Sequence, residues 1–454
     1  MTGRKFGWTL AIMAVDVGLV NAAIVLSFLI EFVGGLPSGN FGAYVTVWPW
    51  LSLVAVVLFQ VYSLYNAHRK KWPEVVVSLL LSVLWLNVAT MALSFLLRSF
   101  AFPRGVFVIA FFVQLVLLAW WRRWLWKYER RVFRVRRVLV VGPAAEAGAL
   151  AAKLAGSAPA PFDAMGLVVD GEGNGEDQWP ARVVGTYEQF PLAMETVAPE
   201  EVYLCAGVPA DEKTWFVNYL VSADCPVFVV PGVYEIFVSR GRLDQVEDTP
   251  VFALNSSLAI PEEWRWLKRL TDLFFSAFLL VALSPVMALI AAGVRVTSPG
   301  PALYRQERMT ERGREFHVYK FRTMVDGAEK HSGPVLASRD DPRLTGFGRF
   351  LRATRLDELP QLFNVLRGEM SLVGPRAERP FFVRRFLKET PEYALRMQVK
   401  SGITGLAQVS GRYSTDYADK LKYDLLYVRG YSPLKDLVIL LQTVKVIFMR
   451  DKAV

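Results

Sequence analysis

The residues best suited to chemistry are two adjacent carboxylates, Asp357 and Glu358, in the stretch RATRLDELPQLFNV. Neighbouring carboxylates repel each other, and the start of a helix needs one of them at most. Pro360 suits the first turn of a helix, so the pair would lie beside a helix N-terminus, which favours carboxylates and phosphates. Arg352 and Arg355 can lower the carboxylate pKa values and bind phosphate in a bidentate manner. The pattern therefore predicts a phosphate-handling site.

Two carboxylates in a cationic site can divide the work of a phosphoryl transfer. One can bind Mg²⁺, which neutralises phosphate charge, while the other attacks phosphorus, as aspartyl-phosphate chemistry requires. The alternative is structural, a helix cap with surface ion pairs. The acidic pair lies in one of four polar clusters in this part of the chain, and this concentration favours the catalytic interpretation. The other three clusters supply Lys320, Arg322, Arg376, Arg379, Thr404, Gln408 and Arg412.

The composition excludes several other kinds of site. A length of 454 residues predicts roughly two to four domains, and a hydrophobic content of 53% indicates membrane segments. With three histidines in the chain, a histidine-based zinc site is disfavoured. Cys205 and Cys225 form no CxxC pair and are typical of small buried residues in a reducing compartment. Any catalytic metal would therefore be an oxygen-bound ion such as Mg²⁺.

Four apolar runs open the chain, at about residues 8–32, 41–65, 75–97 and 106–126. Each has the roughly 20 residues that a helix needs to cross a bilayer. Basic residues gather before the first run, between the second and third, and after the fourth. The positive-inside rule then places these segments, and everything after residue 126, in the cytoplasm. Anchoring on an anionic leaflet explains most of the net charge of +10, so nucleic acid is not an expected partner.

From residue 137 the pattern changes to short β-branched runs separated by helical stretches: RVLVVGP, MGLVVDG, EVYLCAG and PVFVVPG. Such alternation predicts a parallel sheet covered by helices, as in a Rossmann-like domain. After the first strand, Gly142 is followed by Ala144 and Ala147 where a dinucleotide fingerprint has glycine. Because Ala144 would obstruct a pyrophosphate, we expect a structural, regulatory or oligomerising role, with nucleotide binding as the alternative.

A fifth apolar run, at 270–294, is also long enough to span a membrane. Basic residues flank both of its ends, and Ser284 and Pro285 interrupt its middle. Proline kinks or breaks a helix, so this segment could enter the cytoplasmic leaflet and return to the same side. An ordinary span with a tolerated kink is the alternative. A full crossing would separate the acidic pair from a cytoplasmic activated substrate, and we therefore expect a re-entrant helix.

The motifs after residue 264 resemble those of the bacterial sugar transferase family. The resemblance rests on the fifth apolar run with its flanks, on HVYKFRTM, on RLDELPQLFNVLRGEMSLVGPRAERP and on SGITGLAQVSGR. The four N-terminal runs and the degenerate Rossmann-like segment are similar to those of long, multidomain members. The resemblance implies transfer of hexose-1-phosphate from a UDP-hexose to undecaprenyl phosphate through a covalent intermediate, with release of UMP. In the family this reaction initiates exopolysaccharide, capsule or O-antigen synthesis.

The resemblance also implies roles for individual residues. Asp357 falls at the family's nucleophile position and Glu358 at its Mg²⁺-ligand position, while Ser284 and Pro285 match the dipeptide that breaks the re-entrant helix. Ala377 stands where many relatives have proline, a form common among long members. Further polar residues of the matched motifs are expected to bind phosphate or substrate: Lys320, Arg322, Arg352, Arg355, Arg376, Arg379, Gln408, Arg412, Asp424 and Tyr427.

The expected architecture has three parts: a membrane α-helical bundle (1–130), a degenerate Rossmann-like α/β domain (131–255) and an α/β catalytic domain (256–454) with a re-entrant membrane helix hairpin at 264–298. We expect a multi-pass protein of the bacterial inner membrane, with the catalytic domain on the cytoplasmic face and Mg²⁺ as cofactor. Expected partners are a UDP-hexose (glucose or galactose), undecaprenyl phosphate, the lipid bilayer and downstream glycosyltransferases, and a homodimer is an open alternative to a monomer.

Two other functions stay open. An NAD-dependent nucleotide-sugar dehydratase can also join four membrane helices to a Rossmann-like domain, but it needs an intact glycine fingerprint and a YxxxK pair. A non-catalytic assembly scaffold would tolerate the loss of Asp357, whereas a covalent enzyme would not.

Overall fold

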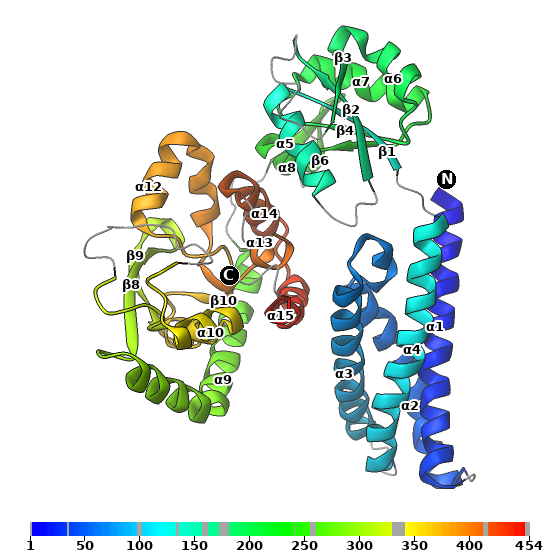
Figure 1. The fold of residues 1–454 in the computed structure, drawn as a ribbon, viewed down its shortest axis with the longest axis vertical. Coiled ribbons are helices and arrows are strands. Elements are labelled where there is room, and N and C mark those ends of the chain that lie inside the picture. Colours follow the sequence, from blue (N-terminus) through cyan, green and yellow to red (C-terminus); the bar gives the residue numbers. More distant parts are fainter. Residues whose placement is uncertain are drawn as a thin grey trace. The chain divides into compact units, whose positions relative to one another are not determined.

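A computed structural model describes residues 2–33, 36–97, 102–132, 136–156, 162–171, 181–239, 241–254, 260–328, 341–411 and 416–449 (Figure 1). The chain divides into two compact units, Met1–Val230 and Pro231–Val454. Each unit is described by itself below. The second unit begins at Pro231, ahead of the start at residue 256 that the sequence predicts for the catalytic domain.

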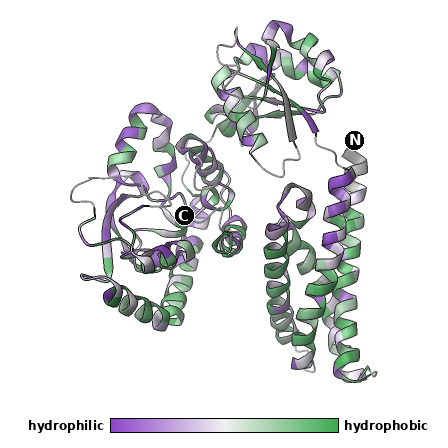
Figure 2. Cartoon of the chain, viewed as in Figure 1, coloured by the Kyte–Doolittle hydropathy of each residue, from purple (hydrophilic) through white to green (hydrophobic). Residues whose placement is uncertain are grey.

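The first unit begins with four long helices: α1 (Thr2–Glu31), α2 (Ser38–Val61), α3 (Trp72–Leu96) and α4 (Arg104–Val132). All four are long and apolar enough to cross a membrane, as predicted, and Figure 2 shows hydrophobic residues along most of their length. Helix α4 continues past the predicted end at residue 126 because its basic last turns can remain helical outside the apolar stretch.

Polar contacts inside the bundle join the helices in pairs. Asn21 Nδ2 of α1 donates to Ser52 Oγ of α2 over 3.0 Å, and Asn87 Nδ2 of α3 donates to Gln114 Oε1 of α4 over 3.0 Å. Asp16 forms a buried ion pair with an arginine of α4. Such side-chain pairs fix the register of neighbouring helices, because an unpaired polar group in an apolar bundle is costly.

A five-stranded parallel sheet follows in the first unit, built from β1 (Arg136–Val141), β2 (Phe162–Val169), β3 (Val183–Thr186), β4 (Glu201–Leu204) and β5 (Val227–Val229). The strand order is β3-β2-β1-β4-β5. Connecting helices are α5 (Ala144–Ala155), α6 (Phe190–Val197), after the 3₁₀ turn η3 (Tyr187–Gln189), and α7 (Ala210–Ser222). The predicted parallel α/β sheet is thus present. Strand β3 was missed because four half-buried residues carry little periodicity.

The turn after β1 brings the chain close to the turn after β4. A side chain at Gly142 would place its Cβ 2.4 Å from Cys205 Cβ, so only glycine fits there. Glu146, in the first turn of α5, accepts a hydrogen bond of 3.0 Å from the backbone N–H of Gly207. This contact bridges the two adjacent strands β1 and β4 at their carboxyl ends, where the strand order reverses.

The second unit begins with helix α8 (Val233–Val238) and the two-stranded antiparallel hairpin β6 (Arg242–Val246) and β7 (Thr249–Ala253). Helix α9 (Glu262–Thr297) precedes a second antiparallel hairpin, β8 (Leu303–Met309) and β9 (Glu315–Phe321), joined through the 3₁₀ turn η4 (Glu311–Gly313). A short parallel pair, β10 (Ser371–Val373) with β11 (Gly402–Thr404), lies in the core of this unit.

Helices and 3₁₀ turns surround these strands. They are α10 (Gly346–Thr354), η5 (Leu356–Glu358), α11 (Gln361–Arg367), α12 (Pro380–Glu389), η6 (Pro391–Gln398), α13 (Leu406–Ser410), α14 (Tyr417–Arg429) and α15 (Pro433–Ile447). Buried apolar residues of β9, α11, β10, α14 and α15 form one core. This core fixes the elements that carry the acidic pair.

Helix α9 is the fifth helix long and apolar enough to cross a membrane. It contains Ser284 and Pro285 yet remains one helix over 36 residues, which corrects the expectation that this dipeptide breaks it. Ser284 Oγ donates to the carbonyl of Val281 over 2.8 Å, and Figure 1 shows the helix bending along its length. Proline is the usual cause of a sharp bend in a continuous helix, because it removes one backbone donor.

The first turns of α9 hold the core of the second unit. Arg269 donates to the carbonyls of Val365 and Leu366, at 2.7 and 2.8 Å, and so caps the C-terminus of α11. Asp272 accepts a 2.9 Å hydrogen bond from the backbone N–H of Leu372 at β10. Because α11 begins just after the acidic pair, these contacts tie the pair's position to the long helix.

Candidate active site

The acidic pair lies on a single 3₁₀ turn, η5, between helices α10 and α11. Arg355 ends α10 in the left-handed conformation, with φ 57°, and so reverses the chain directly before the pair. Pro360 is the N-cap of α11, close to the position that the sequence predicts. The short turn presents both carboxylates at the start of α11, whose N-terminus favours negative charge.

Glu358 is held by two cations. Lys320 Nζ of β9 donates to Glu358 Oε1 at 3.0 Å, and Arg376 Nη2 donates to the same oxygen at 2.9 Å. Burial opposes ionisation of Glu358, but the charges of Arg376, Lys320 and Arg355 outweigh it and hold its pKa below the usual range. Glu358 is therefore a fixed anion at neutral pH.

Asp357 is also buried, but its surroundings differ. Among the residues that the structure describes, none donates a hydrogen bond to its carboxylate. Burial raises the pKa of Asp357 to about 6; Lys320 opposes this increase, while the negative charge of Glu358 adds to it. At neutral pH the side chain is mostly ionised, and its oxygens are not engaged by any described donor. Such a carboxylate is available as a nucleophile.

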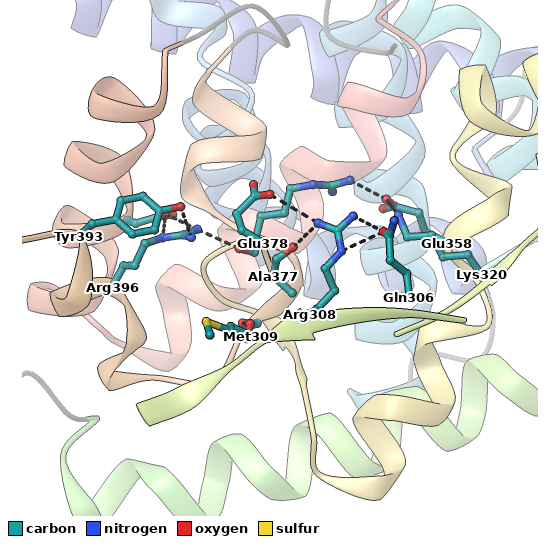
Figure 3. A network of polar contacts seen from close by, with 12 residues as sticks. Gln306, Arg308, Met309, Lys320, Glu358, Ala377, Glu378, Tyr393 and Arg396 are labelled. Carbon is teal, nitrogen blue, oxygen red and sulfur yellow. Dashed lines mark hydrogen bonds and ion pairs between the residues drawn. The ribbon is translucent and has the colours of Figure 1, made fainter. Parts of the chain in front are cut away.

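A small pocket adjoins Glu358. Its charged lining comes from Arg308, Lys320, Arg376 and Glu358, and Gln361 adds an amide. Figure 3 shows Arg308, Lys320 and Glu358 among their polar contacts. Three cations against one anion give the lining a surplus of positive charge, which favours phosphate oxygens. Asp357 is not part of its wall, although it directly precedes Glu358 on the same turn.

Three other predicted arginines belong to the same neighbourhood. Arg352 Nε donates to Thr323 Oγ1 at 3.1 Å, and its charge helps to lower the pKa of Asp357 against the effect of burial. The charge of Arg355 stabilises ionised Glu358. Arg379 is the N-cap residue of α12 and lies close enough to Arg308 to lower the pKa of that guanidinium, although burial lowers it more.

Arg322 is placed differently from what the family resemblance implies. Its guanidinium donates to the carbonyls of Ser298 and Pro299, both at 2.6 Å, directly after the end of α9. It is buried there, and these bonds direct its donors toward the chain after α9 and not toward the acidic pair. The structure gives Arg322 a role in holding the chain that leaves α9.

The remaining predicted site residues lie one layer behind the pair or apart from it. Asp424 forms a buried 2.7 Å ion pair with Arg396, and Tyr427 donates to Asp436 Oδ1 over 2.8 Å. The buried amide of Gln408 has no hydrogen-bond partner among the described residues. Arg412 lies outside the described residues.

Three basic residues have roles that were not predicted from the sequence: Arg308 in the pocket, Arg396 behind it, and Lys268, which the sequence places only in the basic flank of α9. Lys268 Nζ donates to Asp436 Oδ2 over 2.7 Å and to Val373 O over 2.9 Å. The sequence did carry a signal for Arg308. Side chains two positions apart in a strand lie on the same face, so Gln306 and Arg308 share one face of β8, the strand beside the one that carries Lys320. The register that brings these residues together, Gln306 opposite Val318, was not readable from the sequence.

The chemistry of the donor set fits a magnesium ion only in part. Both described donors to Glu358 use Oε1, which leaves Oε2 to bind a cation. In the described part of the chain, no group of three or more histidine, cysteine, aspartate or glutamate side chains gathers to hold a metal. Mg²⁺ is commonly bound through one or two carboxylates together with substrate phosphates. Glu358 Oε2 is thus one ligand available to such an ion, and the other ligands would have to come from a phosphate group or water.

Fold and site together define an α/β protein that carries long apolar helices and an acidic pair surrounded by basic side chains. The family model of the bacterial sugar transferases matches residues 263–450. A UDP-glucose:undecaprenyl-phosphate glucose-1-phosphate transferase of Klebsiella pneumoniae is 40% identical over 233 residues, which cover 50% of this chain and 50% of that protein. A UDP-glucose:undecaprenyl-phosphate glucose-1-phosphate transferase of Caulobacter vibrioides is 42% identical over 193 residues, or 41% of this chain and 71% of that protein.

A relative with a different named sugar is the UDP-N-acetylgalactosamine-undecaprenyl-phosphate N-acetylgalactosaminephosphotransferase of Aeromonas hydrophila. It is 35% identical over 241 residues, which cover 52% of this chain and 56% of the relative. The chain belongs to the bacterial sugar transferase family. It spans about half the length of the Klebsiella and Aeromonas relatives that it matches.

Proposed function

We propose that this chain is a membrane phosphoglycosyl transferase that moves hexose-1-phosphate from a UDP-hexose to undecaprenyl phosphate. The observation that supports this most is the division between the two carboxylates. Glu358 is fixed as an anion by Lys320 and Arg376, whereas Asp357 has no described hydrogen-bond donor. A structural helix cap would use its carboxylate oxygens on backbone N–H groups. An unengaged, buried carboxylate beside three cations fits a nucleophile that attacks phosphorus.

In the proposed first step, an oxygen of Asp357 attacks the sugar-proximal phosphorus of the UDP-hexose. A bond forms between that oxygen and phosphorus, the bond from phosphorus to the bridging oxygen breaks, and UMP leaves with the electron pair. Arg308, Lys320 and Arg376 face the pocket where the diphosphate would bind, and their charges would stabilise the developing negative charge. The product of this step is an aspartyl phosphosugar.

In the second step, a phosphate oxygen of undecaprenyl phosphate attacks the same phosphorus. The bond from phosphorus to Asp357 breaks, which regenerates the carboxylate and releases undecaprenyl-diphosphate-hexose. No proton transfer is needed, because an ionised phosphate is the nucleophile. Glu358 Oε2 would hold the magnesium ion, which when bound would neutralise part of the diphosphate charge.

The same proposal assigns the long helix α9 to the bilayer. Large apolar side chains such as Phe278, Val281 and Leu289 are exposed on its surface, with 60%, 76% and 73% of their area accessible. With basic residues at both ends, a bent helix and Pro285 within it, a re-entrant path would keep the acidic pair on the cytoplasmic face of the inner membrane. There UDP-hexose and the lipid phosphate meet, and the product would serve downstream glycosyltransferases that extend a polysaccharide.

In the middle domain, the strand order β3-β2-β1-β4-β5 matches the first five positions of the doubly wound order 3-2-1-4-5-6, with a switch point between β1 and β4. A dehydratase would bind its dinucleotide there. The carboxylate of Glu146 occupies this switch point and would repel a pyrophosphate. This contact favours the transferase over the dehydratase.

The decisive experiment measures UMP release by the purified protein with Mg²⁺, undecaprenyl phosphate and a panel of UDP-sugars that includes UDP-glucose, UDP-galactose and UDP-N-acetylgalactosamine. In a second arm, labelled UDP-hexose without lipid should leave a phosphosugar on the peptide that contains Asp357. The Asp357→Asn variant should lose activity by at least about 1,000-fold, because the covalent route is removed.

The control for this variant is Asp419→Asn, which neutralises a carboxylate that pairs with Lys422 on α14. It should release UMP at the wild-type rate. A scaffold function predicts instead that Asp357→Asn behaves like Asp419→Asn, with no adduct and full support of polysaccharide assembly. Either that result or an adduct on another residue contradicts the proposed mechanism.

A further inference from the structure

The buried Arg396 and the partly buried Arg308 donate hydrogen bonds to consecutive carbonyls of the segment that carries Arg376. Arg396 Nη2 donates to the carbonyl of Arg376 at 2.9 Å, and Arg308 Nη1 donates to the carbonyl of Ala377 at 2.8 Å (Figure 3). The backbone N–H of Met309 then donates to the carbonyl of Glu378 at 2.9 Å. Three carbonyls in a row are therefore bound by groups from β8 and η6.

Arg396 is itself held from three sides. Its Nε donates to Asp424 Oδ2 at 2.7 Å, and its Nη1 donates to the hydroxyl of Tyr393 at 2.8 Å. The side chains of Arg396 and Asp424 are only 7% and 2% exposed. A buried ion pair is maintained only where its geometry is good and its remaining donors are satisfied. The packing of α14 against η6 thus fixes the direction in which Nη2 of Arg396 points, toward the carbonyl of Arg376.

The side chain of Arg376 has the opposite character. It is 40% exposed and reaches the edge of the pocket, where it contacts Glu358 Oε1 at 2.9 Å. A long, half-exposed side chain has many rotamers, and holding it against an anion costs conformational entropy. A rigid backbone lowers this cost because it leaves only the side-chain torsions to be fixed.

We infer that Arg396, set by Asp424, is a positioning residue that aims Arg376 at the diphosphate of the nucleotide sugar. This inference rests on the proposed function. Arg396 and Asp424 do not line the pocket, so they act through Arg376 and have no contact of their own with substrate. Asp424 accordingly serves in the layer behind the site, in place of the substrate contact that the family resemblance implies.

The test is a double-mutant cycle on UMP release with UDP-hexose. Arg396→Lys keeps the charge that pairs with Asp424, but a lysine cannot also reach the Arg376 carbonyl in the same geometry. It should lower kcat/KM for the UDP-hexose by about tenfold, the size of one lost hydrogen bond from a charged donor. In an Arg376→Ala background the same change should have no further effect, because the group that it positions is gone.

The matched control is Tyr393→Phe, which removes a different hydrogen bond from the same guanidinium and leaves the Arg376 carbonyl bonded. It should keep the wild-type kcat/KM, with a melting temperature lowered as in Arg396→Lys. Equal losses in Tyr393→Phe and Arg396→Lys, or additive losses with Arg376→Ala, overturn the inference and indicate a general structural role.

A second variant covers the case in which Arg396→Lys does not fold. Arg396→Gln/Asp424→Asn removes both buried charges together, so no unpaired ion is left, and it also removes the bond to the Arg376 carbonyl. It should show the same tenfold loss and the same non-additivity. If the wild-type protein releases no UMP, the proposed function fails; if it does so but the cycle is additive, only the positioning role fails.

Discussion

Two short helices of this chain start in similar ways but are surrounded by opposite charges. Helix α5 of the middle domain follows a glycine turn, and α11 of the second unit follows the acidic pair. At α5 the carboxylate of Glu146 itself binds the backbone N–H of Gly207. At α11, Lys320 and Arg376 converge on Glu358, and Asp357 is left without a described donor.

The difference shows that a helix N-terminus alone does not make a phosphate site. Both helix starts favour negative charge through their unpaired N–H groups. At α5 the protein supplies that charge itself, so a phosphate would meet repulsion. At α11 the carboxylates are outnumbered by cations, so a diphosphate would gain charge-assisted hydrogen bonds. The sign of the surrounding side chains decides which helix start is a functional site.

The largest effect is expected when the same substitution, glutamate to glutamine, is made at both helix starts. Glu358→Gln should reduce UMP release by at least about 100-fold, because Lys320 and Arg376 lose the anion that orders them and the metal ion loses its ligand. Glu146→Gln should leave UMP release at the wild-type level. Single-turnover and steady-state assays on both variants provide the measurement. A loss of similar size in the two variants would show that the two helix starts are functionally equivalent.

A second test uses pH. Burial raises the pKa of Asp357 to about 6, and only its ionised form can attack phosphorus. Formation of the aspartyl adduct should therefore fall about tenfold per pH unit below pH 6 and stay level above it. The pKa of Glu358 is held below the usual range, so protonation of this residue does not lower the rate of adduct formation near neutral pH. Rapid-quench measurement of adduct formation between pH 5 and 8 would check this; a rate independent of pH over this range contradicts the assignment of Asp357.

The same comparison shows how far the sequence could go. Periodicity and motif order were enough to predict the four N-terminal helices, the parallel α/β sheet and the turn that carries Asp357 and Glu358. They worked because each depends on local pattern, such as the length of an apolar run or the place of Pro360 at a helix start.

Contacts between distant elements were not readable from the sequence. Arg322 and Lys320 stand two positions apart in one motif, yet Arg322 binds the carbonyls of Ser298 and Pro299 just after α9, while Lys320 reaches Glu358. Arg396 was missed because it lies in a turn with no motif of its own and acts on a carbonyl, which leaves no residue-type signal. Likewise, Pro285 predicted a bend, but whether the helix breaks depends on how its neighbours satisfy the freed carbonyl.

A smaller effect is expected on stability. The pKa of Asp357 is 3.8 in an unstructured chain and about 6 in the folded protein. Above pH 6 both states are ionised, and the folded state bears the full cost of the buried charge. As pH falls below 6 the folded state takes up a proton first, and the cost fades. Asp357→Asn should therefore stabilise the protein by on the order of 1–3 kcal/mol at pH 8, and by less at pH 5. Thermal unfolding in detergent at the two pH values measures the difference.

The outcome that contradicts this prediction is an Asp357→Asn variant that is less stable than the wild type at pH 8, or whose advantage grows as pH falls. Either result would mean that Lys320, Arg352 and Arg376 stabilise the charge of Asp357 more than burial destabilises it. The nucleophile would then be a favourable ion-pair partner, and its readiness to react would need another origin.

The smallest effect belongs to the middle domain. Glu146→Gln keeps the shape of the side chain but replaces a charge-assisted hydrogen bond at Gly207 with a neutral one, and the group is exposed. The loss of folding free energy should be about 0.5 kcal/mol or less, seen as faster hydrogen exchange at the β4–α7 turn alone.

The same substitution also removes the repulsion at the switch point. Titration with NAD⁺ or inorganic phosphate therefore separates two possible causes of a closed nucleotide site, the charge of Glu146 and the shape of the turn after β1. Binding that appears only in the variant shows that the charge of Glu146 closes the site. No binding in either protein assigns the closure to the Gly142–Ala144 turn, where alanine stands in place of a fingerprint glycine.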